Sequence, residues 1–135
     1  MKKYCADTNF LLSFLTDRNI EQQAAAKKYF EKALKAEIEI IVIENVITEL
    51  VYVLQSIYRV SRDNIHEILR SLSLTPGIKI DTYFSLNELI QLWPESVSDY
   101  GDALLIKYAK KNKTGILTFD KKMKGIMKKT GIKLT

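Results

Sequence analysis

The chain has 135 residues, of which 47% are hydrophobic and 27% charged, with five glycines and two prolines. This length suits one domain with a substantial core, and the composition excludes a disordered, collagen-like or low-complexity chain. No apolar run reaches the ~18–20 residues of a membrane span, and the N-terminus lacks a signal-peptide core, so we expect a single cytoplasmic domain over residues 1–135.

The positive charge is concentrated in the last fifth of the chain. Residues 1–106 carry 11 Lys and Arg against 15 Asp and Glu, whereas residues 107–135 carry 10 Lys and one acid, Asp120. Such a basic segment is often only a solvated surface. Beside an acidic site it also suits an anionic substrate such as RNA or DNA.

Cysteine and histidine each occur once, as Cys5 and His66. An internal disulfide and a zinc site built from these residue types are therefore excluded. We expect Cys5 to be a buried thiol in the first strand and His66 to be solvated on a surface helix.

The first stretch of the chain predicts a strand-to-helix corner. An apolar run, residues 4–6, ends at Asp7, Thr8 and Asn9, and an apolar helix is expected to follow. At the carboxyl ends of parallel strands such corners bind ligands. The alternative is that Asp7 or Thr8 only caps the helix by accepting a backbone hydrogen bond.

Strands and helices alternate along the rest of the chain. Further strands, rich in β-branched residues, are predicted over residues 37–43, 78–80, 115–118 and, at the sheet edge, 132–134. Helices are predicted over residues 8–15, 20–36, 45–58, 61–73, 85–93 and 99–111, with a short lysine-rich helix after residue 120. This alternation predicts an α/β fold with a central, mainly parallel sheet of four or five strands, covered on both faces.

Two of these helices have apolar faces that define part of the expected core. The face of the helix over residues 45–58 is predicted to consist of Val46, Leu50, Val53, Leu54 and Ile57. The buried stripe of the helix over residues 99–111 is predicted to include Asp102, Leu105, Ile106 and Ala109.

Four carboxylates lie at apolar boundaries. Asp7 and Asp120 end strands, while Glu49 and Asp102 lie on or beside buried helical stripes. A buried, unpaired charge costs several kcal/mol, which a hard divalent cation such as Mg²⁺ or Mn²⁺ would offset. Asp99, one helical turn before Asp102, would be an auxiliary ligand. The alternative is structural: Glu49 and Asp102 pair with lysines, and Asp7 and Asp120 cap helices.

This arrangement of acids suits metal-assisted hydrolysis of a phosphodiester. One or two cations would activate a water, offset the charge that grows in the transition state and stabilise the leaving 3′ oxygen. Asn9 and Thr118, at the same strand ends, would position water or a metal ligand through their side-chain oxygens.

Four motifs together resemble the PIN-domain ribonucleases, and most of all the VapC-type toxins of type II toxin–antitoxin modules in bacteria and archaea. They are DTN at residues 7–9, the Glu within TELVYVL, the segment DYGDALLIKYAK and TFD near the C-terminus. The resemblance extends over essentially the whole chain. It implies that Asp7, Glu49, Asp102 and Asp120 are metal-binding acids and that Asp99 is the extra acid often found before the third. The polar supporting positions would be Asn9 and Thr118.

The resemblance also implies a Rossmann-like α/β/α sandwich, dependence on Mg²⁺ or Mn²⁺, and endonucleolytic cleavage of RNA that leaves 5′-phosphate and 3′-hydroxyl ends. It implies a homodimer and a small antitoxin from the same operon that blocks the site. Residues suited to an apolar partner surface, with core packing as the alternative, are Phe10, Leu11, Phe14, Tyr29, Phe30, Tyr52 and Tyr58. The chain departs from the family after TFD, where many relatives have an acid and then Phe but this chain has Lys122 and Met123. The chain therefore has no acidic ligand at this position, and the rim of the site is more basic.

Three other functions are alternatives for this pattern of acids. A receiver domain needs a phosphoacceptor Asp at the end of a central strand, but the second predicted strand ends at Glu44 and Asn45, and the third reaches Asp81 only after a weak strand signal. A haloacid-dehalogenase-like phosphatase would have Asp in place of Asn9. A non-catalytic PIN-like module that binds nucleic acid or protein is the remaining alternative, although binding through lysines would not need the four acids.

Overall fold

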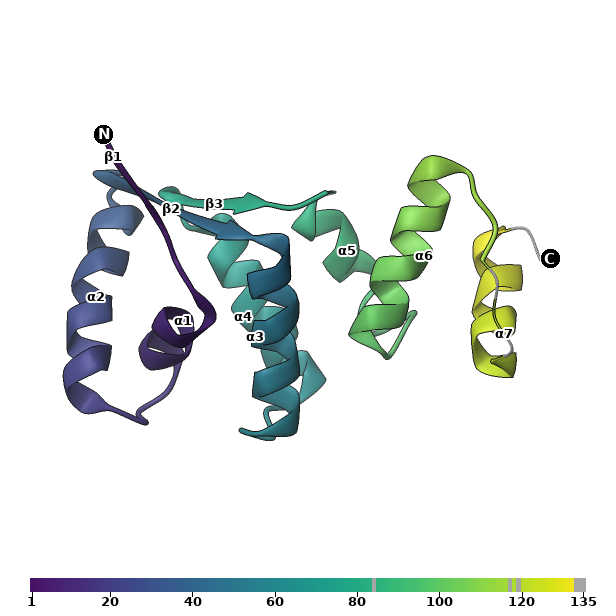
Figure 1. Cartoon of the computed structure of the whole chain (residues 1–135), viewed down its shortest axis with the longest axis horizontal. Coiled ribbons are helices and arrows are strands. Elements are labelled where there is room, and N and C mark those ends of the chain that lie inside the picture. The colour runs from purple at the N-terminus through teal and green to yellow at the C-terminus, as the bar shows by residue number, and fades with distance from the viewer. Residues whose placement is uncertain (84, 117, 119, 133–135) are drawn as a thin grey trace. The chain divides into compact units, whose positions relative to one another are not determined.

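The computed structural model describes residues 1–83, 85–116, 118 and 120–132, and the chain divides into two compact units. Unit 1 comprises Met1–Asn87 and unit 2 comprises Glu88–Thr135. Unit 1 contains a parallel sheet with helices packed on it, and the described part of unit 2 is mainly helical (Figure 1). The prediction that residues 1–135 form one domain stays a prediction.

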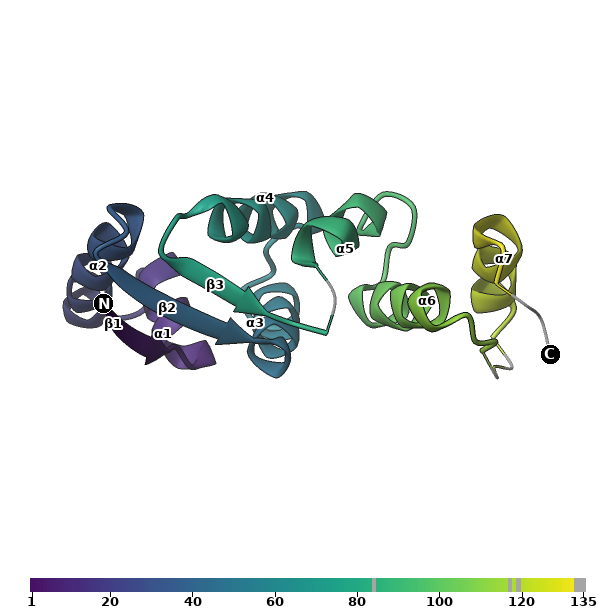
Figure 2. The ribbon, with the colours of Figure 1, turned by 90° about the horizontal axis from the view of Figure 1, so that it is seen from above.

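The sheet of unit 1 has three parallel strands in the order β1-β2-β3, with β2 in the middle (Figure 2). The strands are β1 Lys2–Cys5, β2 Ile38–Ile43 and β3 Ile78–Asp81. Tyr4 lies opposite Ile40, which in turn lies opposite Ile78. The strands predicted over residues 37–43 and 78–80 are thus confirmed. The two later strands, residues 115–118 and 132–134, include residues 117, 133 and 134, which lie outside the described residues.

The seven helices of the described chain correspond to the seven predicted ones. They are α1 Thr8–Leu15, α2 Ile20–Leu34, α3 Glu44–Ser56, α4 Arg62–Leu74, α5 Leu86–Leu92, α6 Tyr100–Asn112 and α7 Lys121–Thr130. Capping side chains fix the starts of α2 and α4, since Asn19 accepts the Gln22 N–H and Ser61 accepts the Asn64 N–H. None of these helices combines the length and apolarity needed to span a membrane.

Helices α1 to α4 cover one face of the sheet in unit 1 (Figure 1). The covering of the other face stays a prediction. Three residues of the predicted face of α3, Val46, Leu50 and Leu54, are buried. Ile57 is 66% exposed and lies one residue beyond the end of α3 at Ser56.

The prediction that Cys5 is buried is wrong. All four residues of β1 are exposed in this structure, because β1 is an edge strand of the sheet in unit 1. His66 is half-buried on α4, with its Nδ1 atom 3.7 Å from Oε1 of Glu67, so it is less solvated than predicted.

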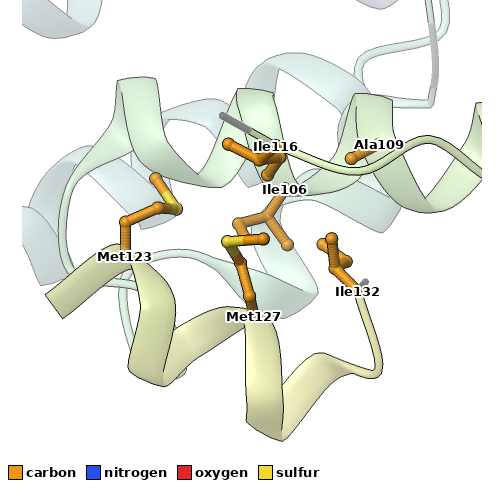
Figure 3. Close-up of a cluster of buried hydrophobic side chains, with 6 residues drawn as sticks. All are labelled: Ile106, Ala109, Ile116, Met123, Met127 and Ile132. Atoms are coloured by element: carbon orange, nitrogen blue, oxygen red, sulfur yellow. The ribbon is translucent and has the colours of Figure 1, made fainter. Parts of the chain in front are cut away.

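Unit 2 has a hydrophobic core of its own, to which α6 and α7 both contribute (Figure 3). Its members are Ile106, Ala109, Ile116, Met123, Met127 and Ile132. The predicted burial of Ile106 and Ala109 is confirmed. That of Leu105 is wrong, since Leu105 is 45% exposed and the buried face of α6 runs instead through Tyr100 and Ala103.

Gly77 occupies a position in unit 1 where no larger residue fits. Its N–H donates to the Ala33 carbonyl at 2.8 Å, and its carbonyl accepts the Ile40 N–H at 2.7 Å. A Cβ atom here would lie 2.5 Å from the carbonyl oxygens of Ala33 and Ile38. We expect Gly77→Ala to lower the free energy of unfolding by about 3 kcal/mol or more, measured by urea denaturation.

Gly125→Ala is the matched control for this substitution. Gly125 lies inside α7 with no atom within 4 Å of the added Cβ, so the change should stabilise the chain by about 0.5–1 kcal/mol. An equal denaturation midpoint for Gly77→Ala and the wild type would contradict the close contact at Gly77.

Candidate active site

Asp7 lies at the corner between β1 and α1, as predicted. It is the N-cap of α1, and its Oδ1 atom accepts the Phe10 N–H at 2.8 Å. The cap that the alternative predicted for Asp7 is therefore present. The carboxylate is exposed, and its Oδ2 atom takes no part in the cap. The cap thus fixes the side chain at the helix N-terminus, where a negative charge is favourable, and leaves an oxygen for a ligand.

Two acids of unit 2 are N-caps in the same way. Asp99 accepts the Asp102 N–H at 2.8 Å at the start of α6, and Asp120 accepts the Lys122 N–H at 2.9 Å at the start of α7. Thr118 accepts the backbone N–H of Asp120 at 3.0 Å through its Oγ1 atom. Thr118 therefore orients a candidate ligand residue through its backbone.

Asp7 and Glu49 follow neighbouring strands of unit 1. Asp7 lies just after β1, and Glu49 lies on α3, the helix that follows β2. Strands β1 and β2 are parallel neighbours, with Cys5 opposite Ile41 and the Ala6 N–H donating to the Ile41 carbonyl at 3.0 Å. Their carboxyl ends therefore lie at the same edge of the sheet, where α1 and α3 begin and pack against each other. Glu49 lies in the second turn of α3, and its side chain is exposed.

Asn9 lies beside a small cavity next to Asp7. The cavity has a volume of about 290 Å³, and its lining includes Asp7, Asn9, Ser13 and Gln22. The Asn9 carbonyl accepts Nη2 of Arg18 at 2.9 Å, while the Asn9 side chain is exposed. The predicted supporting role of this side chain is therefore compatible with its position.

The burial expected of these carboxylates is observed only for Asp102. Asp7, Glu49 and Asp120 are exposed, whereas Asp102 is half-buried. Asp7, Glu49 and Asp120 are thus more exposed than we expected of carboxylates at apolar boundaries. The lysine pairing considered as an alternative is also not found, since neither Glu49 nor Asp102 takes part in an ion pair within the described residues.

The surroundings of Asp102 in unit 2 disfavour its ionised form. Burial raises the pKa of Asp102, and the negative charges of Asp99 and Asp120 raise it further, while the charge of Lys122 lowers it. The charges of Asp99 and Asp120 therefore act unfavourably on the ionised carboxylate of Asp102 within unit 2. A bound cation would relieve this repulsion, and the donors are the carboxylate oxygens that hard cations prefer.

A complete metal-binding group is not present in the structure as described. Over residues 1–83, 85–116, 118 and 120–132, no three His, Cys, Asp or Glu side chains lie close enough together to hold a metal ion. Asp7 and Glu49 belong to unit 1, and Asp99, Asp102 and Asp120 belong to unit 2. The assignment of these five acids as metal ligands stays a prediction.

Comparison with known proteins identifies the family. The sequence profile of the PIN domain matches residues 4–129, which include parts of both units. The chain belongs to the PIN domain family. This match and the parallel sheet confirm the predicted fold class, a PIN-type α/β fold with a Rossmann-like arrangement.

This PIN-domain chain is also similar to a protein described as VapC ribonuclease, from Aquifex aeolicus (strain VF5). The two are 28% identical over 127 residues, and the alignment covers 92% of each chain. The predicted likeness to the VapC-type proteins is thereby confirmed. No solved structure matched the chain.

One contact in this PIN domain was not predicted from the sequence. Nζ of Lys122 donates to Oγ of Ser98 at 3.1 Å, which connects the first turn of α7 with the residue before Asp99. In the sequence, Lys122 stood out only as part of the basic rim that follows Asp120. The pairing with Ser98 depends on the packing of α7 in unit 2.

Proposed function

We propose that this PIN-domain protein is a metal-dependent endoribonuclease, and that it is the toxin of a type II toxin–antitoxin module in the cytoplasm. The observation that carries the proposal is the alignment with the VapC ribonuclease of Aquifex aeolicus, because it covers 92% of both chains. The PIN-domain match and the set of acids along the chain support it further.

The residues proposed for catalysis are Asp7, Glu49, Asp102 and Asp120, with Asp99 as an additional ligand. Bound by these carboxylates, Mg²⁺ or Mn²⁺ would supply Lewis-acid activation of water and of the RNA phosphate. The fit to such a cation is supported by the donor set, which is entirely carboxylate, and by the raised pKa of Asp102, which burial and the charges of Asp99 and Asp120 produce.

The chain's own residues would orient these acids. The capping hydrogen bonds fix the side chains of Asp7, Asp99 and Asp120, so that little side-chain entropy is lost when a ligand binds. Thr118 holds the backbone of Asp120, and we propose the same supporting role for the side chain of Asn9. The products would have 5′-phosphate and 3′-hydroxyl ends.

The experiment that tests this proposal is incubation of the purified, antitoxin-free protein with total cellular RNA in Mg²⁺, Mn²⁺ or EDTA. Discrete fragments that form only with the metals would support it. If the folded, metal-loaded protein cuts no RNA, a non-catalytic PIN-like module that binds nucleic acid or protein becomes the better explanation.

We propose two protein partners, a second copy of the chain and an antitoxin. Of the residues predicted for an apolar partner surface, Leu11 and Phe30 are core residues, and Phe14 stacks on Phe30 with ring centroids 3.8 Å apart. Tyr29 and Tyr52 are exposed. Leu11, Phe14 and Phe30 therefore contribute to core packing.

An apolar groove on unit 1 is the surface that we assign to the antitoxin. It has a volume of about 450 Å³, and its lining includes Phe14, Leu15, Phe30, Leu34, Ile68 and Leu72. Lys27, Glu31 and Glu67 lie at the same groove, so an apolar segment flanked by charges of both signs would match it. Such an antitoxin segment would bury Leu34, which is otherwise 62% exposed.

Leu34→Glu should weaken inhibition by the antitoxin at least about tenfold, because the carboxylate would be desolvated in the groove. The measurement is the rate of RNA cleavage at increasing concentrations of the cognate antitoxin. Ile57→Glu is the control, since Ile57 is equally exposed at 66% but does not line the groove. Equal inhibition of both variants would exclude the groove as the antitoxin site.

A further inference from the structure

Lys122 is held at two points near the acids of unit 2. Its backbone N–H donates to Oδ1 of Asp120 at 2.9 Å, and its Nζ atom donates to Oγ of Ser98 at 3.1 Å. Ser98 directly precedes Asp99, the N-cap of α6. The side chain of Lys122 therefore extends from the start of α7 to the start of α6, and both of these helix starts are capped by a carboxylate.

The ammonium of Lys122 lies within the electrostatic field of these carboxylates but is not neutralised by direct pairing. Its charge acts on Asp102 in the direction opposite to the charges of Asp99 and Asp120. Within the part of the chain that the structure describes, Lys122 takes part in no ion pair. An ammonium has three N–H donors, and Ser98 accepts one of them, so two can bind an anion.

Lys122 differs from the other lysines of α7. Lys121, Lys124, Lys128 and Lys129 are also exposed, while Met123 and Met127 anchor the helix in the core of unit 2. No side-chain hydrogen bond or ion pair of these four lysines is found among the described residues. They fit a solvated basic face, whereas the side chain of Lys122 reaches Ser98, the residue before Asp99.

We propose that Lys122 binds a phosphate of the RNA substrate next to the acids of unit 2 and so positions the strand for cleavage. This inference rests on the proposed ribonuclease function. The physical need for such a residue is clear, because a polyanionic strand approaching several carboxylates is repelled. A lysine is a suitable phosphate ligand, acting as a point charge with several donors.

The first test is RNA binding without catalysis. A short fluorescein-labelled single-stranded oligouridylate is titrated in EDTA, with fluorescence anisotropy as the readout, at several salt concentrations. Lys122→Gln should weaken binding about tenfold, and the slope of log K against log salt should become shallower by about 0.7. Lys122→Arg should restore most of the affinity, since it retains the charge.

Lys129→Gln is the matched control for Lys122→Gln. It removes the same charge from an exposed position at the other end of α7, so it reports only the long-range effect of net charge. We expect its affinity to change less than about threefold. Circular dichroism and thermal melting would establish that every variant is folded.

Ser98→Ala tests whether the hydrogen bond to Oγ orients the ammonium. The backbone carbonyl of Ser98, which accepts Nε1–H of Trp93 at 3.1 Å, is unchanged by this substitution. We expect an affinity loss smaller than that of Lys122→Gln but in the same direction. In cleavage assays with Mn²⁺, both substitutions should raise KM for RNA while kcat changes less than about threefold.

Three results would overturn the assignment. One is an equal loss of affinity in Lys122→Gln and Lys129→Gln, which would indicate a long-range effect of net charge and no local contact of Lys122 with a phosphate. Another is unchanged binding and KM in Lys122→Gln, which would make the Ser98 contact purely structural. The third is an absence of oligouridylate binding by the wild type. A wild type that binds but never cleaves would instead contradict the ribonuclease function, and the binding comparison would still decide the role of Lys122.

Discussion

Asp7→Asn should reduce metal-dependent RNA cleavage by at least about a hundredfold without unfolding the protein. The substitution removes the negative charge proposed to bind the metal. It retains a side-chain oxygen for the cap of α1, where Asp7 now accepts the Phe10 N–H at 2.8 Å, and Asn is as good an N-cap residue as Asp. The variant therefore separates the structural role of this side chain from its proposed catalytic role.

The measurement is the initial rate of RNA cleavage in Mn²⁺, together with a thermal melt of each protein. Asp63→Asn is the matched control, because Asp63 is also an exposed acid at a helix N-terminus, in the first turn of α4. It should cleave RNA at the wild-type rate. Full activity of a purified Asp7→Asn variant, free of any copurified nuclease, would contradict the assignment of Asp7.

Asp102→Asn should have two opposite effects: a loss of RNA cleavage by at least about a hundredfold and a gain of stability in EDTA. The stability gain follows from the raised pKa of Asp102, which burial and the charges of Asp99 and Asp120 produce. At neutral pH the ionised Asp102 destabilises the metal-free fold, and Asn removes that repulsion. The melting temperature of the variant should therefore exceed that of the wild type.

The difference in stability between Asp102→Asn and the wild type depends on pH. In the folded state the pKa of Asp102 lies above its ordinary value of 3.8, so the folded chain binds this proton more tightly than the unfolded chain. The contribution of Asp102 to stability is therefore fully present below pH 3.8 and is lost as the pH rises through the raised pKa. Asp102→Asn should accordingly stabilise the protein at neutral pH and lose this advantage in acid.

Mn²⁺ should reduce the difference in melting temperature between Asp102→Asn and the wild type, because the cation would offset the repulsion among the wild-type carboxylates. Glu95→Gln, a change at an exposed acid of the same unit, should alter neither the melting temperature in EDTA nor the rate. If Asp102→Asn is less stable than the wild type in EDTA at neutral pH, the repulsion inferred for Asp102 is wrong.

Much of the architecture was determined by the sequence alone, because it depends on neighbours along the chain. The β-branched run of β2 and the apolar periodicity of the helices predicted these elements to within about two residues. Asp7 was recognised both as a cap and as a candidate ligand, because both roles follow from its place between a strand and a helix. The four ordered motifs that contain Asp7, Glu49, Asp102 and Asp120 predicted the PIN domain family.

Other features were decided only by the tertiary structure, because they depend on residues that are distant in the chain. Cys5 is exposed because β1 lies at the edge of the sheet, and strand order cannot be read from one strand. The stripe on α6 runs through Tyr100 rather than Leu105, because packing in unit 2 selects one of two adjacent apolar faces. The field at Asp102 and the contact of Lys122 with Ser98 arise where the starts of α6 and α7 come together. Electrostatic and hydrogen-bonding interactions act through space, so only the folded chain determines which charges are neighbours.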